Sequence, residues 1–250
     1  MKKPQKICQI VNMVFLGLIL IADSLFITRA VKVDIIKPIA SILFVLCGLF
    51  NYLYIDKYHS SKHQLKGLVL LGGLIFAFAG DVVLTYHFLI GAILFAIAHI
   101  FFLVYFSFIS QVNWIDMLCT AILLTFTMLM ILLYPHFDFK GMDLMIMVYA
   151  AVISLMTGKA IANFIKKRSF GTLILMAGAV LFLFSDIMLV FNNFASLGII
   201  FDHLCLASYY PAEFLLAYGL LIHGIELTDK PLKSSKKDNS EKEKKEEKKA

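Results

Sequence analysis

Charged residues are scarce in this chain of 250 residues, and they are unevenly placed. Asp, Glu, Lys and Arg make up 16% of the sequence, against about 25% in an ordinary soluble domain, while 60% of the residues are hydrophobic. Residues 229–250 alone hold nine lysines and six acids, which leaves 14 basic and 11 acidic residues for the rest. A soluble domain cannot bury so much apolar surface. Nucleic-acid binding is also excluded as an interpretation, because it needs a basic face on the folded surface.

Cysteine motifs typical of disulfides or metal sites are missing as well, and so is an obvious signal-peptide cleavage site. Cys8, Cys47, Cys119 and Cys205 each lie in an apolar run, without a CxxC motif or a histidine at ligand spacing. Buried thiols behave as small hydrophobic groups, so we expect no disulfide framework, no metal site built on them and no cofactor. The basic N-terminal segment has no obvious small-x-small cleavage site. We therefore expect residues 7–27 to stay as a first membrane span.

Long apolar stretches are what the chain does contain. A hydrocarbon core of about 30 Å needs roughly 20 apolar residues per helix. Eight stretches meet this requirement, at residues 7–27, 36–55, 67–86, 88–109, 114–134, 142–165, 171–191 and 204–226. The fold class predicted is therefore all-α, a polytopic membrane protein with a bundle of eight transmembrane helices over residues 1–228. The lysine- and glutamate-rich tail, residues 229–250, is predicted to be disordered.

The distribution of Lys and Arg predicts the orientation, because positively charged loops stay in the cytoplasm. With the N-terminus inside, the inner segments hold nine basic residues before the tail is counted. The outer segments hold four, namely Arg29, Lys32, Lys37 and Lys140. We therefore expect both termini to be cytoplasmic. A bacterial inner membrane is the expected location, and the sequence indicates no oligomeric state.

A weak internal repeat links the two halves of the chain. The segments FAFAGDVVLTYHF (76–88) and FLFSDIMLVFNNF (182–194) both place an aspartate after an apolar run and a small residue, and Asp81 and Asp186 lie 105 positions apart. The same offset carries the first three spans onto the fifth, sixth and seventh. This pattern favours a four-plus-four duplication with parallel halves, and coincidence between low-complexity sequences is the alternative.

Several ionisable side chains fall inside the predicted spans, where each charge costs at least about 2.5–3.5 kcal/mol at the bilayer centre. They are Asp23, Asp81, His99, Lys159, Asp186, Glu213 and His223. Asp23 is near a helix end, where it would snorkel or cap. Lys159 is expected to snorkel to the cytoplasmic interface. His223 is also close to the inner surface, and its predicted role is structural.

Asp81 and Asp186 differ from these residues, because an aspartate has a short side chain and cannot reach water from its predicted depth. Small residues precede both, in segments 72–80 and 178–179, and such residues let helices approach closely. We therefore predict that the two carboxyls meet in one polar pocket in the outer half of the membrane. His99 reaches the same level, either as part of the pocket or as a hydrogen bond between helices.

At these residues the chain resembles the YhhN family, the integral-membrane lysoplasmalogenases. The resemblance runs from about residue 10 to residue 226. It rests on the following residues and motifs: Lys37-Pro38, GDVVL (80–84), Gly91, Phe95, Ala98-His99, SDIML (185–189), Asn192, Phe194, Ser208-Tyr209-Tyr210 and Glu213. One position departs from the family pattern. Where an amide side chain is expected after the tyrosine pair, this chain has Pro211 and then Glu213.

The resemblance implies hydrolysis of the vinyl-ether bond of a lysoplasmalogen, a lysophospholipid, to a fatty aldehyde and glycerophosphoethanolamine or glycerophosphocholine. This chemistry needs an acid that protonates carbon and a negative group that stabilises the resulting cation. Asp81 and Asp186, sharing one proton, are the predicted catalytic pair. His99, with Tyr209 or Tyr210, would orient a water molecule or a carboxylate.

The resemblance also implies contacts with the substrate. Lys37 at the outer mouth would suit the phosphate of the headgroup. Asn192 is a further predicted substrate contact, as are Tyr209, Tyr210 and Glu213, the last of which would tune the pocket.

Three other functions fit parts of the pattern. A proton-coupled transporter or lipid-flipping protein would use the same buried acids as a relay, although only Pro211 resembles the helix breaks typical of transporters. A metal-dependent hydrolase would draw on His87, His99 and His203, which lack helical metal-ligand spacing. A membrane scaffold without catalytic activity is the third alternative.

Overall fold

The computed structural model describes residues 3–30, 32–59, 64–195 and 197–228. Within these residues the secondary structure consists of eight α-helices: α1 (Lys3–Ile27), α2 (Val33–His59), α3 (Gln64–Leu84), α4 (Phe88–Ile109), α5 (Trp114–Leu133), α6 (Asp143–Lys167), α7 (Phe170–Phe194) and α8 (Ile199–Thr228). Each helix is long and apolar enough to cross a membrane. The predicted eight-helix membrane bundle is therefore confirmed. The prediction for the tail concerns residues outside the described part.

Local signals in the sequence explain where several helices begin and end. Asn113 and Asp116 form a capping box at the start of α5, and Ser169 caps α7. Arg168 ends α6 in the left-handed conformation with φ = 47°. The main difference from the predicted spans is at α8, which begins at Ile199 and continues through Pro211. The helix is therefore not broken at that proline.

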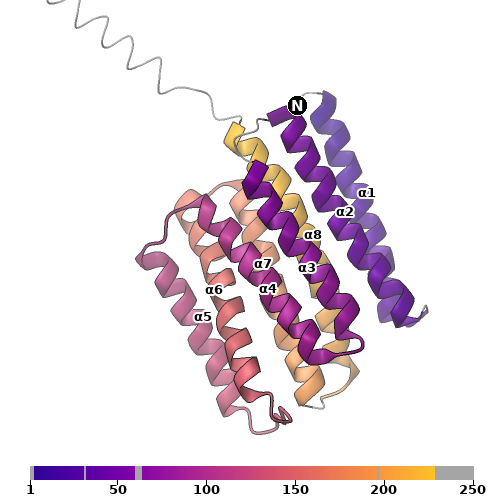
Figure 1. Ribbon diagram of the computed structural model, residues 1–250, viewed down its shortest axis with the longest axis vertical. Coiled ribbons are helices and arrows are strands. Elements are labelled where there is room, and N and C mark those ends of the chain that lie inside the picture. Colours follow the sequence, from indigo (N-terminus) through magenta and orange to yellow (C-terminus); the bar gives the residue numbers. More distant parts are fainter. Residues whose placement is uncertain (1–2, 31, 60–63, 196, 229–250) are drawn as a thin grey trace, which may run out of the picture.

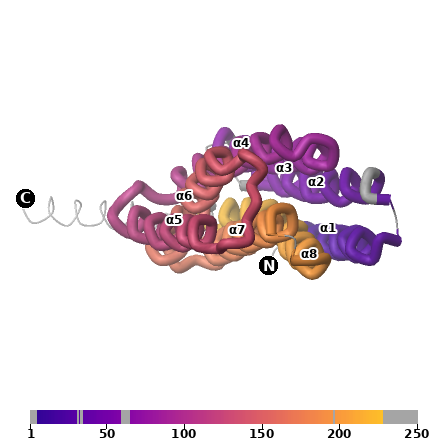
Figure 2. Tube along the Cα trace, turned by 90° about the horizontal axis from the view of Figure 1, so that it is seen from below, coloured from indigo at the N-terminus to yellow at the C-terminus, as the bar shows by residue number. Residues whose placement is uncertain are grey.

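The eight helices form two layers of four (Figure 2). One layer contains α2, α3, α4 and α6, and the other contains α1, α8, α7 and α5. The start of α1 and the end of α8 lie at the same end of the bundle (Figure 1). An even number of membrane crossings requires this arrangement. The loops α3–α4, α5–α6 and α7–α8 lie at the opposite end, which is the outer end in the predicted orientation.

Helix packing is partly matched between the two halves of the chain. The neighbours α1–α2, α2–α3 and α3–α4 correspond to α5–α6, α6–α7 and α7–α8, and all six pairs are in contact. The contact between α2 and α8 has its counterpart in the contact between α6 and α4. The contact between α1 and α8, in contrast, has no comparable counterpart between α5 and α4 among the described residues. The four-plus-four duplication therefore stays a prediction.

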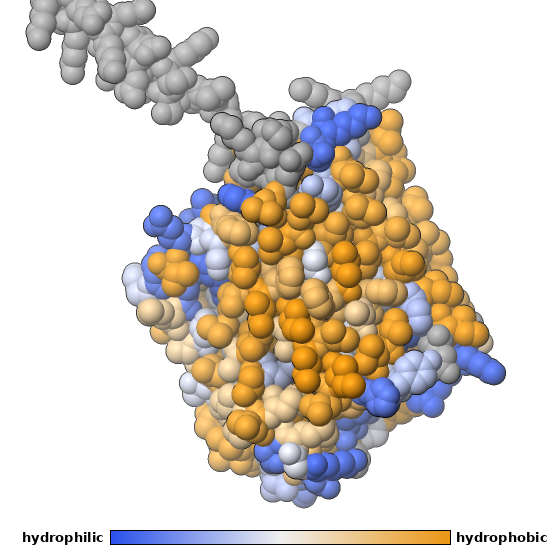
Figure 3. Space-filling view, viewed as in Figure 1, coloured by the Kyte–Doolittle hydropathy of each residue, from blue (hydrophilic) through white to orange (hydrophobic). Residues whose placement is uncertain are grey.

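The outer surface of the bundle is apolar over its middle. Large hydrophobic side chains such as Ile21, Ile75 and Phe126 are exposed there. Figure 3 shows this apolar band, with hydrophilic residues gathered toward the two ends. Lipid chains would cover such a surface, so buried polar groups inside the bundle are the places to look for function.

Candidate functional site

The carboxylate of Asp186 forms the centre of a small polar cluster inside the outer half of the bundle. Asp186 lies on α7, eight residues before the end of the helix at Phe194, which is about 12 Å along the axis. The Tyr149 hydroxyl on α6 donates to Asp186 Oδ2 at 2.7 Å. Nε2 of His99 on α4 lies 3.2 Å from the same oxygen and 2.9 Å from the Tyr149 hydroxyl. Oδ1 takes part in none of these contacts.

An apolar pocket adjoins this cluster. Side chains from α3 to α7 line a cavity of about 50 Å³, and Asp186 and Tyr149 form part of its wall. The pocket extends toward Phe88 and Phe194 at the outer ends of α4 and α7. At about 50 Å³ this cavity is much smaller than the roughly 300–1,000 Å³ of a typical ligand pocket, so it has room beside the carboxylate for only a few atoms of an aliphatic ligand.

The loop between α5 and α6 packs against the end of α7 beside this pocket. Its Phe139 packs with Phe194 and with Ile131 and Ile146 in a small separate core. The backbone amide of Asp138 donates to the carbonyl of Phe194 at 2.9 Å. This loop therefore fixes the end of α7 relative to α5 and α6, and with it the position of the pocket wall.

Asp81 belongs to a second polar cluster, between α2, α3 and α8. The Ser41 hydroxyl donates to Asp81 Oδ2 at 2.6 Å, and the Tyr209 hydroxyl donates to the same atom at 2.8 Å. Lys37 Nζ lies 3.5 Å from Asp81 Oδ1. Both charged side chains are buried. Asp81 is therefore an ion-paired carboxylate with three polar partners.

The two aspartates do not contact each other, so the structure does not bring them together as the sequence analysis predicted. The rings of Phe182 and Tyr209 lie between the clusters, with centroids 5.3 Å apart. Phe182 also packs edge-on against His99 at 4.6 Å. In the described part of the chain no hydrogen bond joins Asp81 to Asp186. Direct sharing of a proton between them is not what this geometry provides.

The small residues before each aspartate explain this separation. A Cβ atom at Gly80 would lie 3.0 Å from the ring of Phe95 on α4, and one at Gly72 would lie 2.8 Å from Phe101. A Cβ atom at Gly178 on α7 would lie 3.1 Å from the Ala212 carbonyl on α8. The glycines thus bring α3 against α4 and α7 against α8. They do not bring α3 against α7.

Each aspartate instead has the partners that a duplicated fold supplies. Asp81 on α3 is bonded from α2 and α8, and Asp186 on α7 is bonded from α6 and α4. These are the same two positions in each half. The two polar clusters thus draw on corresponding helices, and of the two aspartates Asp186 is the one that lines the apolar pocket.

The other predicted site residues lie in different parts of the bundle. Lys37 is not free at the outer mouth, since it pairs with Asp81. Asn192 lies apart, in a surface hollow with Arg29 and Asp202. Tyr210 is fully buried, and its hydroxyl has no hydrogen-bond partner.

Glu213 on α8 is also fully buried. Tyr209 is the polar neighbour of its carboxyl group, and Asp81 and Asp186 are within electrostatic reach.

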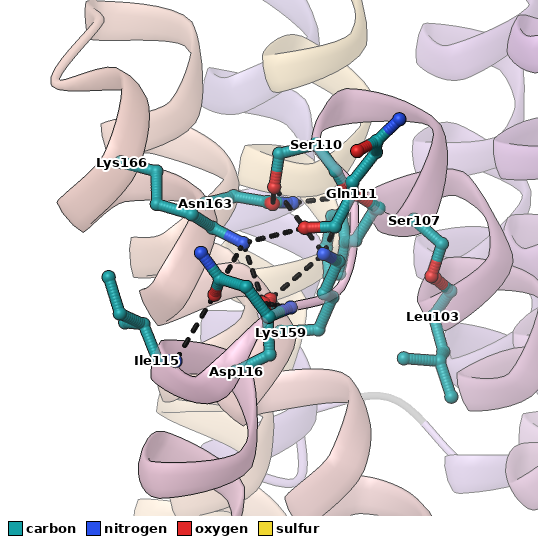
Figure 4. Close-up of polar contacts among 11 residues, drawn as sticks. Leu103, Ser107, Ser110, Gln111, Ile115, Asp116, Lys159, Asn163 and Lys166 are labelled. Atoms are coloured by element: carbon teal, nitrogen blue, oxygen red, sulfur yellow. Dashed lines mark hydrogen bonds and ion pairs between the residues drawn. The ribbon is translucent and has the colours of Figure 1, made fainter.

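The prediction that Lys159 snorkels to the interface is wrong. Its ammonium group is buried, 2.8 Å from Asp116 Oδ1 and 2.8 Å from the Ser110 carbonyl at the end of α4 (Figure 4). Lys166 lies 2.6 Å from the other oxygen of Asp116. The carboxylate at the start of α5 provides a nearer partner than water. This ionic cluster ties the α4–α5 turn to α6.

The expectation that Asp23 snorkels is also wrong, because this side chain is only 4% exposed. Within the described residues its Oδ1 has no hydrogen-bond partner. His223 is buried near the end of α8, with Nδ1 3.9 Å from Glu226 Oε2. Its structural role stays a prediction.

The histidines of the metal-hydrolase alternative are spread over different surroundings. His87 is exposed in the α3–α4 turn, His99 is buried in the Asp186 cluster, and His203 is half-buried near the start of α8. The described residues contain no group of three or more His, Cys, Asp or Glu side chains placed to hold a metal ion.

Sequence reasoning missed Tyr149 and Ser41, which donate hydrogen bonds to the two aspartates. Both lie in apolar spans and carry no charge, so a search for buried charges does not find them. Asp116 had a detectable signal, because Asn113 followed by an acid three residues later predicts a helix start. Its ion pair with Lys159 has no signal in the local sequence.

Fold and site together define a polytopic membrane protein with a buried acid–base cluster at an apolar pocket. Comparison with known proteins then gives the family. The model of the YhhN family matches residues 34–220, and the chain belongs to this family, which includes lysoplasmalogenases. No curated protein and no solved structure matches the chain significantly.

Proposed function

We propose that this protein hydrolyses the vinyl-ether bond of lysoplasmalogens, with Asp186 as the group that acts on the bond. Membership of the YhhN family is compatible with this activity. The observation that carries the proposal is the carboxylate of Asp186 at the wall of an apolar pocket, held by Tyr149 and His99. The pocket would take the atoms of the vinyl-ether bond and the adjoining part of the alkenyl chain, and the headgroup would remain toward the outer surface.

The reaction needs one acid–base group that can reach carbon. A protonated carboxyl donates its proton to the β-carbon of the vinyl ether, and the electron pair of the double bond forms the new C–H bond. This produces an oxocarbenium ion, which the new carboxylate stabilises. Water adds to the α-carbon and returns a proton to the carboxylate. The hemiacetal then breaks its bond to the glycerol oxygen and releases the aldehyde and the alcohol, so that one water is consumed.

The surroundings of Asp186 support giving these steps to it. Its Oδ2 accepts the hydrogen bond of Tyr149, which leaves Oδ1 to transfer the proton. His99, through its contact with Oδ2, fixes the orientation of the carboxyl group. The buried site excludes bulk water, which strengthens electrostatic stabilisation of the cation. Asp81 is ion-paired with Lys37 and does not line the pocket, so its proposed role is structural.

The activity is tested with purified protein in detergent, supplied with a lysoplasmalogen or with the analogue that has a saturated ether. We expect aldehyde to be released from the vinyl ether alone. The Asp186→Asn variant should lose activity by about 10²–10⁴-fold, because this is the usual contribution of a general acid or base. Asp143→Asn, an exposed aspartate at the start of α6, is the matched control and should retain activity.

Two results would overturn the proposal in different ways. Full activity of Asp186→Asn would remove the assignment of the site while leaving the reaction in place. Absence of aldehyde from the wild-type protein would remove the reaction. In that case, movement of a lysolipid across vesicles containing the protein would support the alternative of a lipid-flipping protein.

A further inference from the structure

A second cavity lies at the end of the bundle opposite the Asp186 pocket. It is enclosed by the ends of α2, α4 and α8 and by the start of α3, at the end of the bundle where α1 begins (Figure 1). Tyr105 in its wall is ten residues along α4 from Phe95 of the Asp186 pocket, which is about 15 Å along the axis. The two cavities share no wall residue, and in the predicted orientation the second is the inner cavity.

The wall of the inner cavity carries hydrogen-bond donors that have few partners in the protein. Tyr105 is 4% exposed, and within the described residues its hydroxyl makes no hydrogen bond. Lys66 is half-buried, and its ammonium group lies 5.7 Å from the centroid of the Phe108 ring. None of the ion pairs in the described part of the chain includes Lys66. An ammonium and a hydroxyl group in one wall suit an anionic oxygen such as that of a phosphate.

The same wall also contains an acid. Asp56 lines the cavity together with Lys66, so the charged side chains of its wall have opposite signs. An anion without a positive group would be attracted by one and repelled by the other. The rings of Tyr52 and Tyr105 add aromatic faces, which attract ammonium groups. His223 is the remaining polar side chain of the wall. A zwitterion with a phosphate and an ammonium group therefore matches the wall better than an anion does.

Close packing of the helices holds part of this wall in place. A Cβ atom at Gly67 on α3 would lie 2.8 Å from the ring of Tyr52 on α2. The absence of that atom lets the Tyr52 ring lie directly against the backbone of α3. A wall that is fixed before a ligand arrives lowers the entropy lost on binding.

The size and position of the inner cavity favour a lipid. Its volume is about 80 Å³, which has room for several water-sized groups and is too small for an acyl chain. Phe108 and Leu227 line the cavity and are also exposed on the outside of the bundle. The cavity therefore borders the apolar surface that lipid chains would cover. The polar end of a headgroup can enter it while the chains stay on that surface.

We propose that the inner cavity binds the zwitterionic headgroup of a membrane phospholipid, with its phosphate at Lys66 and Tyr105 and its ammonium group beside Asp56. Phosphatidylethanolamine is the simplest lipid of this kind. The inference does not rest on the proposed vinyl-ether hydrolysis, because it concerns a different cavity and involves no turnover.

Native mass spectrometry of the purified full-length protein in detergent tests the proposal. Phosphatidylethanolamine and phosphatidylglycerol with the same acyl chains are titrated separately, and the bound fraction is measured for each. We expect phosphatidylethanolamine to bind about tenfold more tightly, because phosphatidylglycerol has no ammonium group for Asp56. Equal affinity of the wild-type protein for the two lipids would overturn the proposal.

Variants of the wall locate the binding. Lys66→Met should weaken binding of phosphatidylethanolamine about tenfold, because a charged hydrogen bond to the phosphate is lost. Tyr105→Phe keeps the ring, removes the hydroxyl and should weaken binding about threefold. Lys57→Met is the matched control, since Lys57 is an exposed lysine near the end of α2 that lies 5.4 Å from the Tyr58 ring and does not line the inner cavity. It should bind the lipid as the wild type does.

Asp56→Asn tests the placement of the ammonium group. This variant should bind phosphatidylethanolamine more weakly and phosphatidylglycerol no more weakly, so that the preference between them falls. Thermal unfolding in detergent without added lipid establishes that the variants are folded. Equal losses for Lys57→Met and Lys66→Met, or an unchanged preference in Asp56→Asn, would contradict the assignment of the site.

A soluble compound with the same headgroup separates the two possible sources of the ligand. Glycerophosphoethanolamine has the phosphate and the ammonium group but no acyl chains. At the same concentration it should occupy the protein at least about tenfold less than phosphatidylethanolamine, because it gains nothing from the apolar surface beside the cavity. Equal occupancy by the soluble compound would show that the site does not belong to a lipid.

Discussion

Asp81 on α3 and Asp186 on α7 follow a similar sequence pattern but have different partners. Asp81 has a lysine within 3.5 Å, whereas Asp186 has a tyrosine and a histidine. Lys37 and Asp81 therefore hold α2 and α3 together. Asp186 instead lines the apolar pocket. This difference is the basis on which the proposed function gives the reaction to Asp186.

This difference gives a prediction for stability. Removing the charge of Lys37 with Lys37→Met leaves Asp81 buried without its cation, which should destabilise the protein by about 3–5 kcal/mol. The double variant Lys37→Met/Asp81→Asn should recover much of this loss, because neither charge then remains. Thermal unfolding in detergent measures both effects. A double variant as unstable as the sum of the single variants would show that the two side chains do not act as a pair.

Residue identities explain which parts of the site could be predicted. Asp81, Asp186 and His99 stood out because charged or polar groups are costly inside apolar spans. Their partners were not predictable, because helix packing decides which side chains meet. Lys159 shows the same limit, since its ion pair with Asp116 joins residues 43 positions apart.

At the scale of helices, hydrophobicity and length were sufficient to find all eight spans. Their ends were less accurate, as at α8, because the polar residues of its first turns lower the hydropathy without stopping the helix. The packing of the helices depends on glycines whose neighbours lie elsewhere in the sequence. Gly91 at the start of α4 is one example, because the backbone of Leu84 at the end of α3 lies directly against it.

Gly91→Ala should therefore destabilise the protein. The added Cβ atom would lie 2.6 Å from the Cα atom of Leu84, and backbone cannot move aside as a flexible side chain can. Gly17→Ala on α1 is the control, since nothing lies within 4 Å of the corresponding Cβ atom. This variant should gain up to about 1 kcal/mol from the higher helix propensity of alanine. Equal unfolding temperatures for the two variants would contradict the close approach of α3 and α4.

At the scale of the whole molecule, the helix bundle holds the two aspartates in separate polar clusters, and an apolar pocket lies beside Asp186. The repeat in the sequence predicted equivalent helices, but it could not show which side chains on the neighbouring helices would bond to each aspartate. The contacts α2–α8 and α6–α4 cross between the halves and place those partners. The pocket beside Asp186 likewise takes side chains from both halves, from α3 and α4 as well as from α5, α6 and α7.

Protonation of carbon is the central step of this account, and turnover of a lysoplasmalogen in heavy water tests it most directly. The aldehyde is reduced to the alcohol as it forms, so that later exchange is prevented, and its mass is measured. We expect one deuterium on the carbon next to the former carbonyl group, delivered from Asp186, and no such product from Asp186→Asn. An aldehyde from the wild type without deuterium at that carbon would contradict the mechanism.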